Sequence, residues 1–395
     1  MISPNLRTLE DIKEADKKSH RSGCRRMFNI GIQTNGHNGY YDKYRSLPSL
    51  LRKMNDTTLN MLSRSRLQIT GGSLPYIDCD IKLYTSSDIK QCISRRQHLS
   101  HAPWIAFVGD SKMRVKFNRF VSTNVNFNWR IYNASSEQAT STSWKSYFLR
   151  NPKKYQHSLS VQGYRGTRLD FIWATKGLTT HRGFDVPEPQ LKKWAYEAKR
   201  VPDVVIVGFG MWTMHEEFLL RLPSLRSVSS IAELWLNVAQ VLEDLATRTT
   251  VIAWCQTRTR EIAAIDYVTE EAINLSFAER LKRILHYSRT HSWASEWIDE
   301  VMHMALGYTK GVIIWDTTVP FSLANIKECK DMHAVGHSNH TAYCSPPHLC
   351  CDFVHNDLLT LDDENTMILN LLCNKFTSGN KNYCCSQHFH LNQDM

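Results

Sequence analysis

Apolar runs of strand length alternate along this chain with stretches in which apolar residues recur every three or four positions. Five such runs stand at 104–108, 169–173, 204–208, 251–255 and 312–315. Helical spacing follows the third run, extends from about 263 to 306 after the fourth, and returns at about 364–373. The helix expected after the third run has one apolar face, formed by Ile231, Leu234, Val238, Val241, Leu242 and Leu245. Strands that alternate with helices predict an α/β protein with a parallel sheet and helices on both sides.

The first 75 residues lack this alternation of apolar runs and helical spacing. They are polar and mixed, with Gly, Asn and Ser clustered around 31–39. We therefore expect a poorly structured, polar N-terminal extension over 1–75, with one short helix near 47–62. The remainder, 76–390, is predicted to be one domain, which the chain length of 395 residues allows.

The composition is that of a globular protein, with 42% hydrophobic and 10% aromatic residues. A formal net charge of +10 favours anionic partners, which include nucleic acid, a negatively charged membrane surface and an acidic small substrate. The basic residues are spread along the chain without a recognisable nucleic-acid motif, so we expect no nucleic-acid partner. The sequence shows no run long enough to span a membrane and no apolar signal core near Met1.

The cysteines point to an oxidising compartment. There are eleven of them, and seven crowd one part of the chain: Cys329, Cys344, Cys350, Cys351, Cys373, Cys384 and Cys385. Such a concentration is unusual for a cytosolic enzyme and favours disulfides. An odd total leaves at least one thiol unpaired or joined to another chain. We give the cysteines more weight than the missing signal and expect the secretory pathway.

The tripeptide Gly109-Asp110-Ser111 is the most informative local feature. It follows the apolar run 104–108 and precedes a helical pattern formed by Met113, Phe117, Phe120 and Val121. Ser111 is therefore expected on the turn between a buried strand and a helix, at the carboxyl end of the sheet. A serine there suits a nucleophile, and its own N–H can form half of an oxyanion hole.

Two further motifs can complete such a site. Asp352 precedes His355 by three residues, so the carboxylate can orient the imidazole as a general base; the alternative is a solvent-exposed pair in a loop. The run 204–208 ends at Gly208, with Gly210 and Trp212 just beyond it. Glycines at a strand end let backbone N–H groups approach a ligand, although a tight turn beside a core tryptophan explains the pattern equally well.

Taken in order, these motifs resemble the SGNH (GDSL-like) hydrolase superfamily. More narrowly, they resemble the luminal catalytic domain of the Golgi sialic-acid O-acetyltransferases. The similarity covers about residues 75–390 and rests on the cysteines Cys79 and Cys92, the blocks 105–114, 169–173 and 208–212, the Asp352/His355 pair and the tail 367–375. The resemblance implies a three-layer sandwich around a central, mostly parallel sheet.

The resemblance also implies roles for individual residues. Ser111 is then the nucleophile, His355 the base and Asp352 its orienting acid. In this family an asparagine usually follows a glycine in the block that corresponds to 208–212, and it is absent here. The expected oxyanion donors are therefore the N–H groups of Ser111, Gly208 and Gly210. Arg114 and Trp212 are candidate substrate-binding residues. Alternatively, Arg114 is an ordinary surface arginine on the helix.

The expected reaction is O-acetylation of a sugar hydroxyl through an acetyl-serine, in the Golgi lumen. Acetyl-CoA is the expected acyl donor and an anionic sugar the acceptor, with no cofactor or metal bound by the protein itself. Transfer to water instead would make the chain a carbohydrate O-acetylesterase.

A competing interpretation is a zinc-organised or non-catalytic accessory protein. A dense group of possible ligands comprises Cys329, His333, His337, His340, Cys344, Cys350 and Cys351. Its spacing matches no standard zinc finger, and the stretch 334–340 has the composition of a loop. Under the resemblance, these cysteines would instead pair as disulfides.

Overall fold

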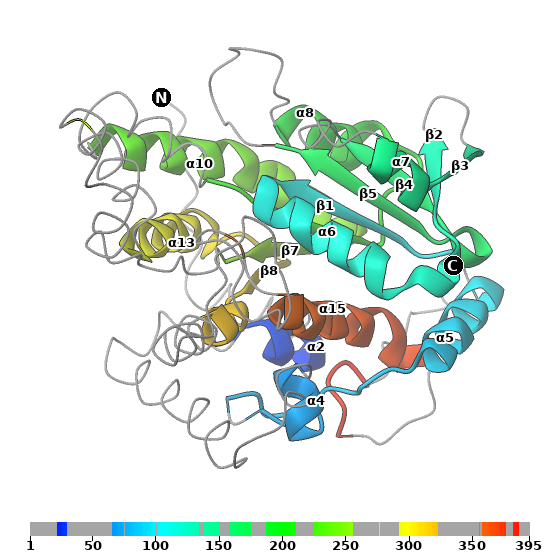
Figure 1. Ribbon diagram of the computed structural model, residues 1–395. Coiled ribbons are helices and arrows are strands. Elements are labelled where there is room, and N and C mark those ends of the chain that lie inside the picture. Colours follow the sequence, from blue (N-terminus) through cyan, green and yellow to red (C-terminus); the bar gives the residue numbers. More distant parts are fainter. Residues whose placement is uncertain are drawn as a thin grey trace, which may run out of the picture.

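The computed structural model describes the parts of the chain that build a central sheet and its flanking helices (Figure 1). The described residues are 22–29, 65–74, 76–99, 101–133, 138–150, 158–174, 187–210, 225–255, 276, 292–322, 355, 358–376 and 382–386.

The described strands form one sheet of eight, in the order β3-β2-β4-β5-β1-β6-β7-β8. Five of them, β5, β1, β6, β7 and β8, run parallel to one another, whereas β2, β3 and β4 are antiparallel to their neighbours. The strands are β1 (Trp104–Gly109), β2 (Arg130–Asn133), β3 (Gln138–Ser143), β4 (Leu159–Gln162), β5 (Arg168–Trp173), β6 (Val204–Gly208), β7 (Thr250–Trp254) and β8 (Val312–Trp315).

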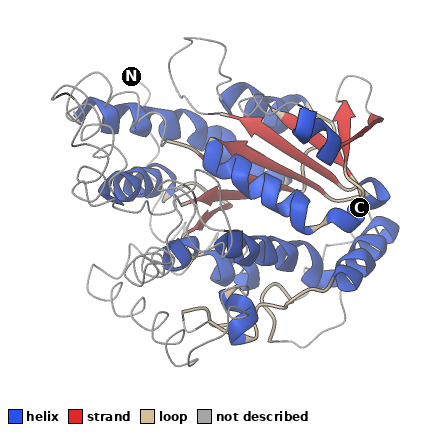
Figure 2. Ribbon diagram, in the orientation of Figure 1, coloured by secondary structure: helices blue, strands red, loops and turns tan. Residues whose placement is uncertain are grey.

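Helices cover both faces of this sheet (Figure 2). Because successive side chains of a strand point to opposite faces, Phe107 packs with the helices of one side and Val108 with those of the other. The first side holds α2 (Ser22–Phe28), α4 (Arg66–Thr70), α5 (Ser86–Leu99), α6 (Ser111–Thr123) and α15 (Leu358–Cys373). The second holds α8 (Pro187–Lys192), the π-helical turn η3 (Lys193–Glu197), α10 (Leu225–Arg248) and α13 (Ser292–Leu306).

The sequence prediction of the central architecture is confirmed. All five expected strands are present and parallel, and the helices α10, α13 and α15 follow where helical spacing was found. The six apolar residues expected on one face of α10 are all buried. The protein is therefore an α/β protein with a mostly parallel sheet.

The expectation for residues 1–75 is wrong for two segments. Met27 and Phe28 of α2 are fully buried against the core, and α4 carries a complete capping box in which Ser65 and Gln68 bond each other's backbone N–H. The short helix expected near 47–62 lies outside the described residues. Within 22–29 and 65–74, this part of the chain is thus integral to the packed domain.

Three disulfides join the region before β1 to the region from Cys373 onward. They link Cys24 to Cys385, Cys79 to Cys384 and Cys92 to Cys373. Disulfides of this kind are typical of oxidising compartments. In the described part of the chain, no helix combines the length and apolar character that crossing a bilayer requires.

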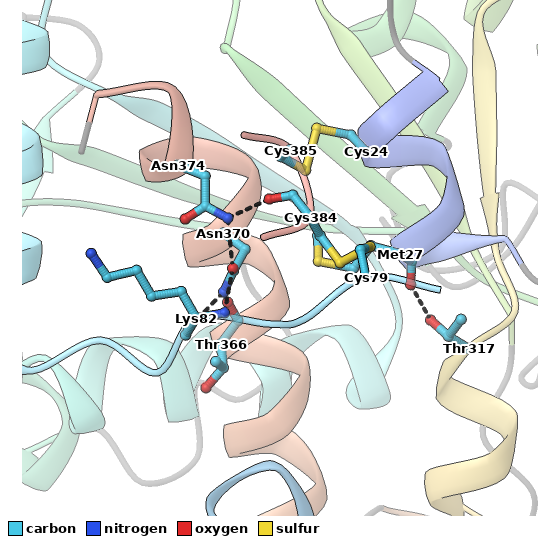
Figure 3. The surroundings of a disulfide bond; sticks show 10 residues. All are labelled: Cys24, Met27, Cys79, Lys82, Thr317, Thr366, Asn370, Asn374, Cys384 and Cys385. Carbon is cyan, nitrogen blue, oxygen red and sulfur yellow. Dashed lines mark hydrogen bonds between the residues drawn. A yellow bond between two sulfur atoms is a disulfide. The ribbon is translucent and has the colours of Figure 1, made fainter. Parts of the chain in front are cut away.

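Hydrogen bonds support two of these cross-links (Figure 3). Asn370 on α15 donates to the carbonyl of Lys82 at 2.9 Å and accepts from the N–H of that residue at 2.8 Å. Asn374 donates both to Asn370 Oδ1 at 2.8 Å and to the carbonyl of Cys384. The segment bearing Cys384 and Cys385 is thereby held against the end of α15 (Figure 3).

Candidate active site

Ser111 lies where the central strand β1 passes into α6 (Figure 1). Gly109 ends the strand, Asp110 is the N-cap, and Ser111 is the first helical residue and partly exposed. The Asp110 carboxylate accepts the Lys112 backbone N–H at 3.0 Å, which satisfies one of the free donors of the first turn. The strand-turn-helix context predicted for the tripeptide is confirmed.

This turn stands at the edge of the sheet where α/β proteins usually bind ligands. The chain continues from β1 to strands on one side of it, then crosses to β6 on the other side and moves outward through β7 to β8. Gly109 of β1 pairs with Trp173 of β5 and with Gly208 of β6. Such a reversal of strand order opens a crevice beyond the carboxyl ends of the strands.

The glycines of β1 and β6 allow the two strand ends to pack closely. A Cβ at Gly109 would lie 2.0 Å from the carbonyl oxygen of Gly208. A Cβ at Gly208 would lie 2.7 Å from the Trp254 ring and 2.9 Å from Met113 Cε. Gly208 is thus required for packing beside the turn of Ser111, whatever its N–H contributes to chemistry.

Gly210 differs from Gly208 in conformation and in surroundings. Its φ of 128° is one that residues with a side chain rarely adopt. A Cβ there would lie 2.9 Å from Ile298 Cγ2 of α13, which packs on the opposite face of the sheet from α6. Gly210, the third predicted oxyanion donor, therefore lies past the end of β6, against α13.

The C-terminal histidine of the predicted site interacts with the Gly109-Asp110-Ser111 turn. Asp110 is fully buried, and burial raises the pKa of its carboxyl above the usual range. Lys112 and its N–H oppose that rise in pKa, and so do weaker electrostatic interactions of Asp110 with His355 and Arg114. His355 is therefore within electrostatic range of Asp110, the residue that precedes Ser111. The His355 Nε2 atom is itself buried.

The sequence analysis gave Asp110 no role of its own, whereas the structure shows it as a fully buried N-cap. Its Oδ1 caps α6, whereas its buried Oδ2 has no hydrogen-bond partner among the described residues. A buried, unsatisfied carboxylate oxygen is costly, so this atom is suited to a hydrogen-bond donor supplied by a ligand. The signal available in the sequence was an aspartate placed at an N-cap directly after a buried strand.

Arg114 extends from the first turn of α6 toward the end of β5. Its guanidinium lies 5.4 Å from the centre of the Trp173 ring, a distance typical of a cation–π contact. Trp173 ends β5 in register with Gly109. A partly exposed cation is thereby held at the same sheet edge as Ser111.

A buried ion pair lies deeper along α6. Lys116 Nζ is 2.5 Å from Glu364 on α15, and both side chains are fully inaccessible. The ammonium also stands 4.3 Å and 4.2 Å from the ring centres of Trp254 and Trp315. Burial lowers the pKa of Lys116 to about 8, against the opposing effect of Glu364.

Several predicted residues lie outside the described part of the chain. They are Asp352, Trp212 and the whole Cys/His group from Cys329 to Cys351. Within the described residues, no group of three or more His, Cys, Asp or Glu side chains is placed to hold a metal ion.

The chain was also compared with known proteins. No protein-family model matches it, and neither a curated protein nor a solved structure does. The similarity to SGNH hydrolases therefore stays a prediction based on the ordered motifs of the sequence.

Proposed function

We propose that this protein is an acyl-transferring enzyme of the SGNH type, with Ser111 as nucleophile, His355 as general base and Asp352 as the acid that orients it. One observation supports this most strongly. His355, from the C-terminal part of the chain, is within electrostatic range of Asp110, which directly precedes Ser111 at the N-terminus of α6. A nucleophile near a base is the arrangement that acyl transfer requires.

In the proposed first step, His355 accepts the Ser111 proton while Oγ attacks the acetyl carbonyl carbon of acetyl-CoA. The carbonyl oxygen becomes an oxyanion, stabilised by the Ser111 N–H and by the dipole of α6. Gly208 and Gly210 are the proposed sources of the remaining donors. The carbon–sulfur bond then breaks, His355 returns the proton to the leaving thiolate, and acetyl-Ser111 remains.

In the second step, a sugar hydroxyl gives its proton to His355 and attacks acetyl-Ser111. The Ser111 oxygen leaves and regains the proton from His355, which releases the O-acetylated sugar. The cation of Arg114, held on Trp173, is suited to the carboxylate of an acidic sugar such as sialic acid. Trp212 is the proposed second contact, and the Golgi lumen the proposed compartment.

The closing experiment compares two serines of the same helix. Ser111→Ala should lower hydrolysis of a chromogenic acetyl ester, and acetyl transfer from acetyl-CoA to sialic acid, by at least about 1,000-fold. Ser122 on α6 donates only to a backbone carbonyl, so Ser122→Ala should retain both activities. A fluorophosphonate should label the parent protein and the Ser122 variant but not Ser111→Ala. Equal turnover or equal labelling in Ser111→Ala would exclude Ser111 as the nucleophile.

The same assays show whether a sugar hydroxyl or water accepts the acetyl group. Acetyl transfer to sialic acid at a rate above that of acetyl-CoA hydrolysis identifies a transferase. Ester hydrolysis without transfer identifies an O-acetylesterase, which uses the same acetyl-serine with water as acceptor.

A further inference from the structure

A second candidate site lies at the opposite edge of the sheet from Ser111. A cavity of about 500 Å³ opens beside the residues that lead into β6 and β7, among them Asp203 and Thr249. Ser111 follows the carboxyl end of β1, which pairs along its length with β6. Since these strands are parallel, the cavity and Ser111 occupy opposite ends of them and are separate sites.

The cavity is strongly basic. Among the described residues, its lining contains one acidic side chain, that of Asp203. Six basic side chains line it as well: Arg96, His101, Lys199, Arg200, Arg248 and Lys375. They come from separate parts of the chain, including α5, the segment before β6, the end of α10 and the turn after α15. Cations gathered from several elements surround the space from different directions.

Asp203 offsets only part of this group, because its oxygens are shared by a backbone N–H and two of the basic side chains. Its Oδ2 accepts the Trp104 N–H at 2.7 Å. Its Oδ1 lies 2.7 Å from His101 Nε2 and 2.8 Å from Arg96. Asp203 also acts to raise the pKa of Lys375, so Lys199, Arg200 and Arg248 are the lining cations that remain.

Two of the arginines are held in place by neutral groups. Arg248 donates to the carbonyl oxygens of Trp194 at 2.6 Å, Ala195 at 3.0 Å and Ala198 at 2.5 Å. Arg200 donates to the carbonyl of Ala102 at 2.9 Å. Among the described residues, neither arginine forms an ion pair, so both charges are fixed in position and remain uncompensated. Such an arrangement is preorganised for an anion.

Lys375 is the cation most affected by its neighbours. Burial lowers the pKa of its ammonium, and repulsion from Arg96 lowers it further. A bound anion would relieve that repulsion and favour the charged form of Lys375. Apolar side chains complete the lining, including those of Val201, Ile313, Leu371 and Leu372.

We infer that this cavity binds a small organic phosphate or sulfate ester. The tetrahedral anion, with several oxygens to share, lies among Lys375, Arg200 and Lys199, whereas the body of the ester packs against the apolar wall formed by Ile313 and Leu372. A cavity of this volume accepts a body of sugar or nucleoside size. Lysine and arginine groups of this kind are the usual partners of phosphate and sulfate oxygens.

The test measures binding of phenyl phosphate, phenyl sulfate and benzyl alcohol to the complete chain by calorimetry. Both esters should bind at least about ten-fold more tightly than the neutral alcohol. Lys375→Glu and Lys199→Glu should each weaken the esters by about ten-fold and leave the alcohol unchanged. Lys193→Glu is the matched control, since Lys193 is exposed, carries the same charge and does not line the cavity.

Three outcomes would overturn the inference. The first is that neither ester binds at about 1 mM ligand. The second is that Lys193→Glu weakens ester binding as much as the two cavity variants do. The third is that, in a parallel binding assay, the protein binds phosphatidic acid vesicles but neither soluble ester. Circular dichroism checks that each variant folds. Ser111→Ala should bind both esters as the parent does, so the result stands apart from the proposed acyl transfer.

Discussion

The Lys116–Glu364 ion pair is a fully buried contact between α6 and α15. Two charges without solvent contact depend on each other, and removal of one leaves the other uncompensated. We therefore predict that Lys116→Met lowers the free energy of unfolding by about 3–5 kcal/mol. The double variant Lys116→Met/Glu364→Leu should recover most of that loss. Urea denaturation of both variants and of Glu364→Leu measures the coupling; simple addition of the two single losses would contradict it.

Asp363 offers a residue-scale test by pH. Its carboxylate accepts the backbone N–H groups of Arg66 and Leu67 at 3.1 Å and 3.0 Å, at the start of α4. Burial raises the pKa of Asp363 to about 7, from about 3.9 in an unfolded chain. The folded state therefore holds this proton more tightly, and the resulting stability is complete below about pH 4 and lost as the pH rises through about 7.

Asp363→Asn removes that titration and keeps an acceptor for one of the two N–H groups. We predict that the stability of the variant relative to the parent increases from about pH 4 to about pH 7. Chemical denaturation at several pH values measures this difference. Parallel profiles for the two proteins would show that Asp363 titrates alike in the folded and unfolded chain.

At the scale of elements, the contact between the ends of β1 and β6 leaves no room for a side chain at Gly109. Gly109→Ala would place a methyl group 2.0 Å from a backbone oxygen, which no side-chain rotation relieves. We expect a loss of at least about 3 kcal/mol in unfolding free energy, comparable to a severe core substitution. Gly71→Ala is a useful comparison, because its Cβ would meet nothing within 4 Å and only its φ of 69° is unfavourable.

The comparison variant should lose about 1 kcal/mol. Thermal unfolding of both proteins separates the steric effect from the conformational one. Similar losses at the two positions would mean that β1 and β6 can separate without a large cost.

The central strands were predictable because strands of a parallel sheet, buried on both faces, are short continuous apolar runs that alternate here with helical spacing. Strands β2, β3 and β4 were missed, since they lack this signal; β3 has the sequence QATSTS and is largely exposed. Their structure depends on antiparallel pairing with β5 and with one another. The short helices α2 and α4 were missed for a related reason, because burial and disulfide bonding define them more than local periodicity does.

The candidate site was likewise predictable only where a local sequence pattern defines it. The position of Ser111 followed from a local pattern, an apolar run and then helical spacing. The burial of Asp110 and the pairing of Lys116 with Glu364 involve residues far apart in the sequence, so no spacing rule reveals them.

At the scale of the whole molecule, the disulfides connect the two ends of the described chain around the sheet. We predict that Cys92→Ser/Cys373→Ser lowers the free energy of unfolding by about 2–5 kcal/mol, chiefly because the unfolded chain gains freedom. Denaturation with and without a reductant provides the measurement. In the parent, reduction should lower stability further than the double variant does, because it also breaks the Cys24–Cys385 and Cys79–Cys384 bonds. Equal stability of parent and double variant in the absence of reductant would contradict the prediction.

The connectivity of these bonds also constrains the order of events during biosynthesis. Cys92 must wait for a partner 281 residues later in the chain, which takes roughly 15–60 seconds at about 5–20 residues per second. If the chain is made into an oxidising compartment, the thiols of Cys24, Cys79 and Cys92 meet oxidising enzymes throughout that interval, before their native partners are available. A cell that makes this protein well therefore needs a disulfide isomerase able to undo early pairings among those three.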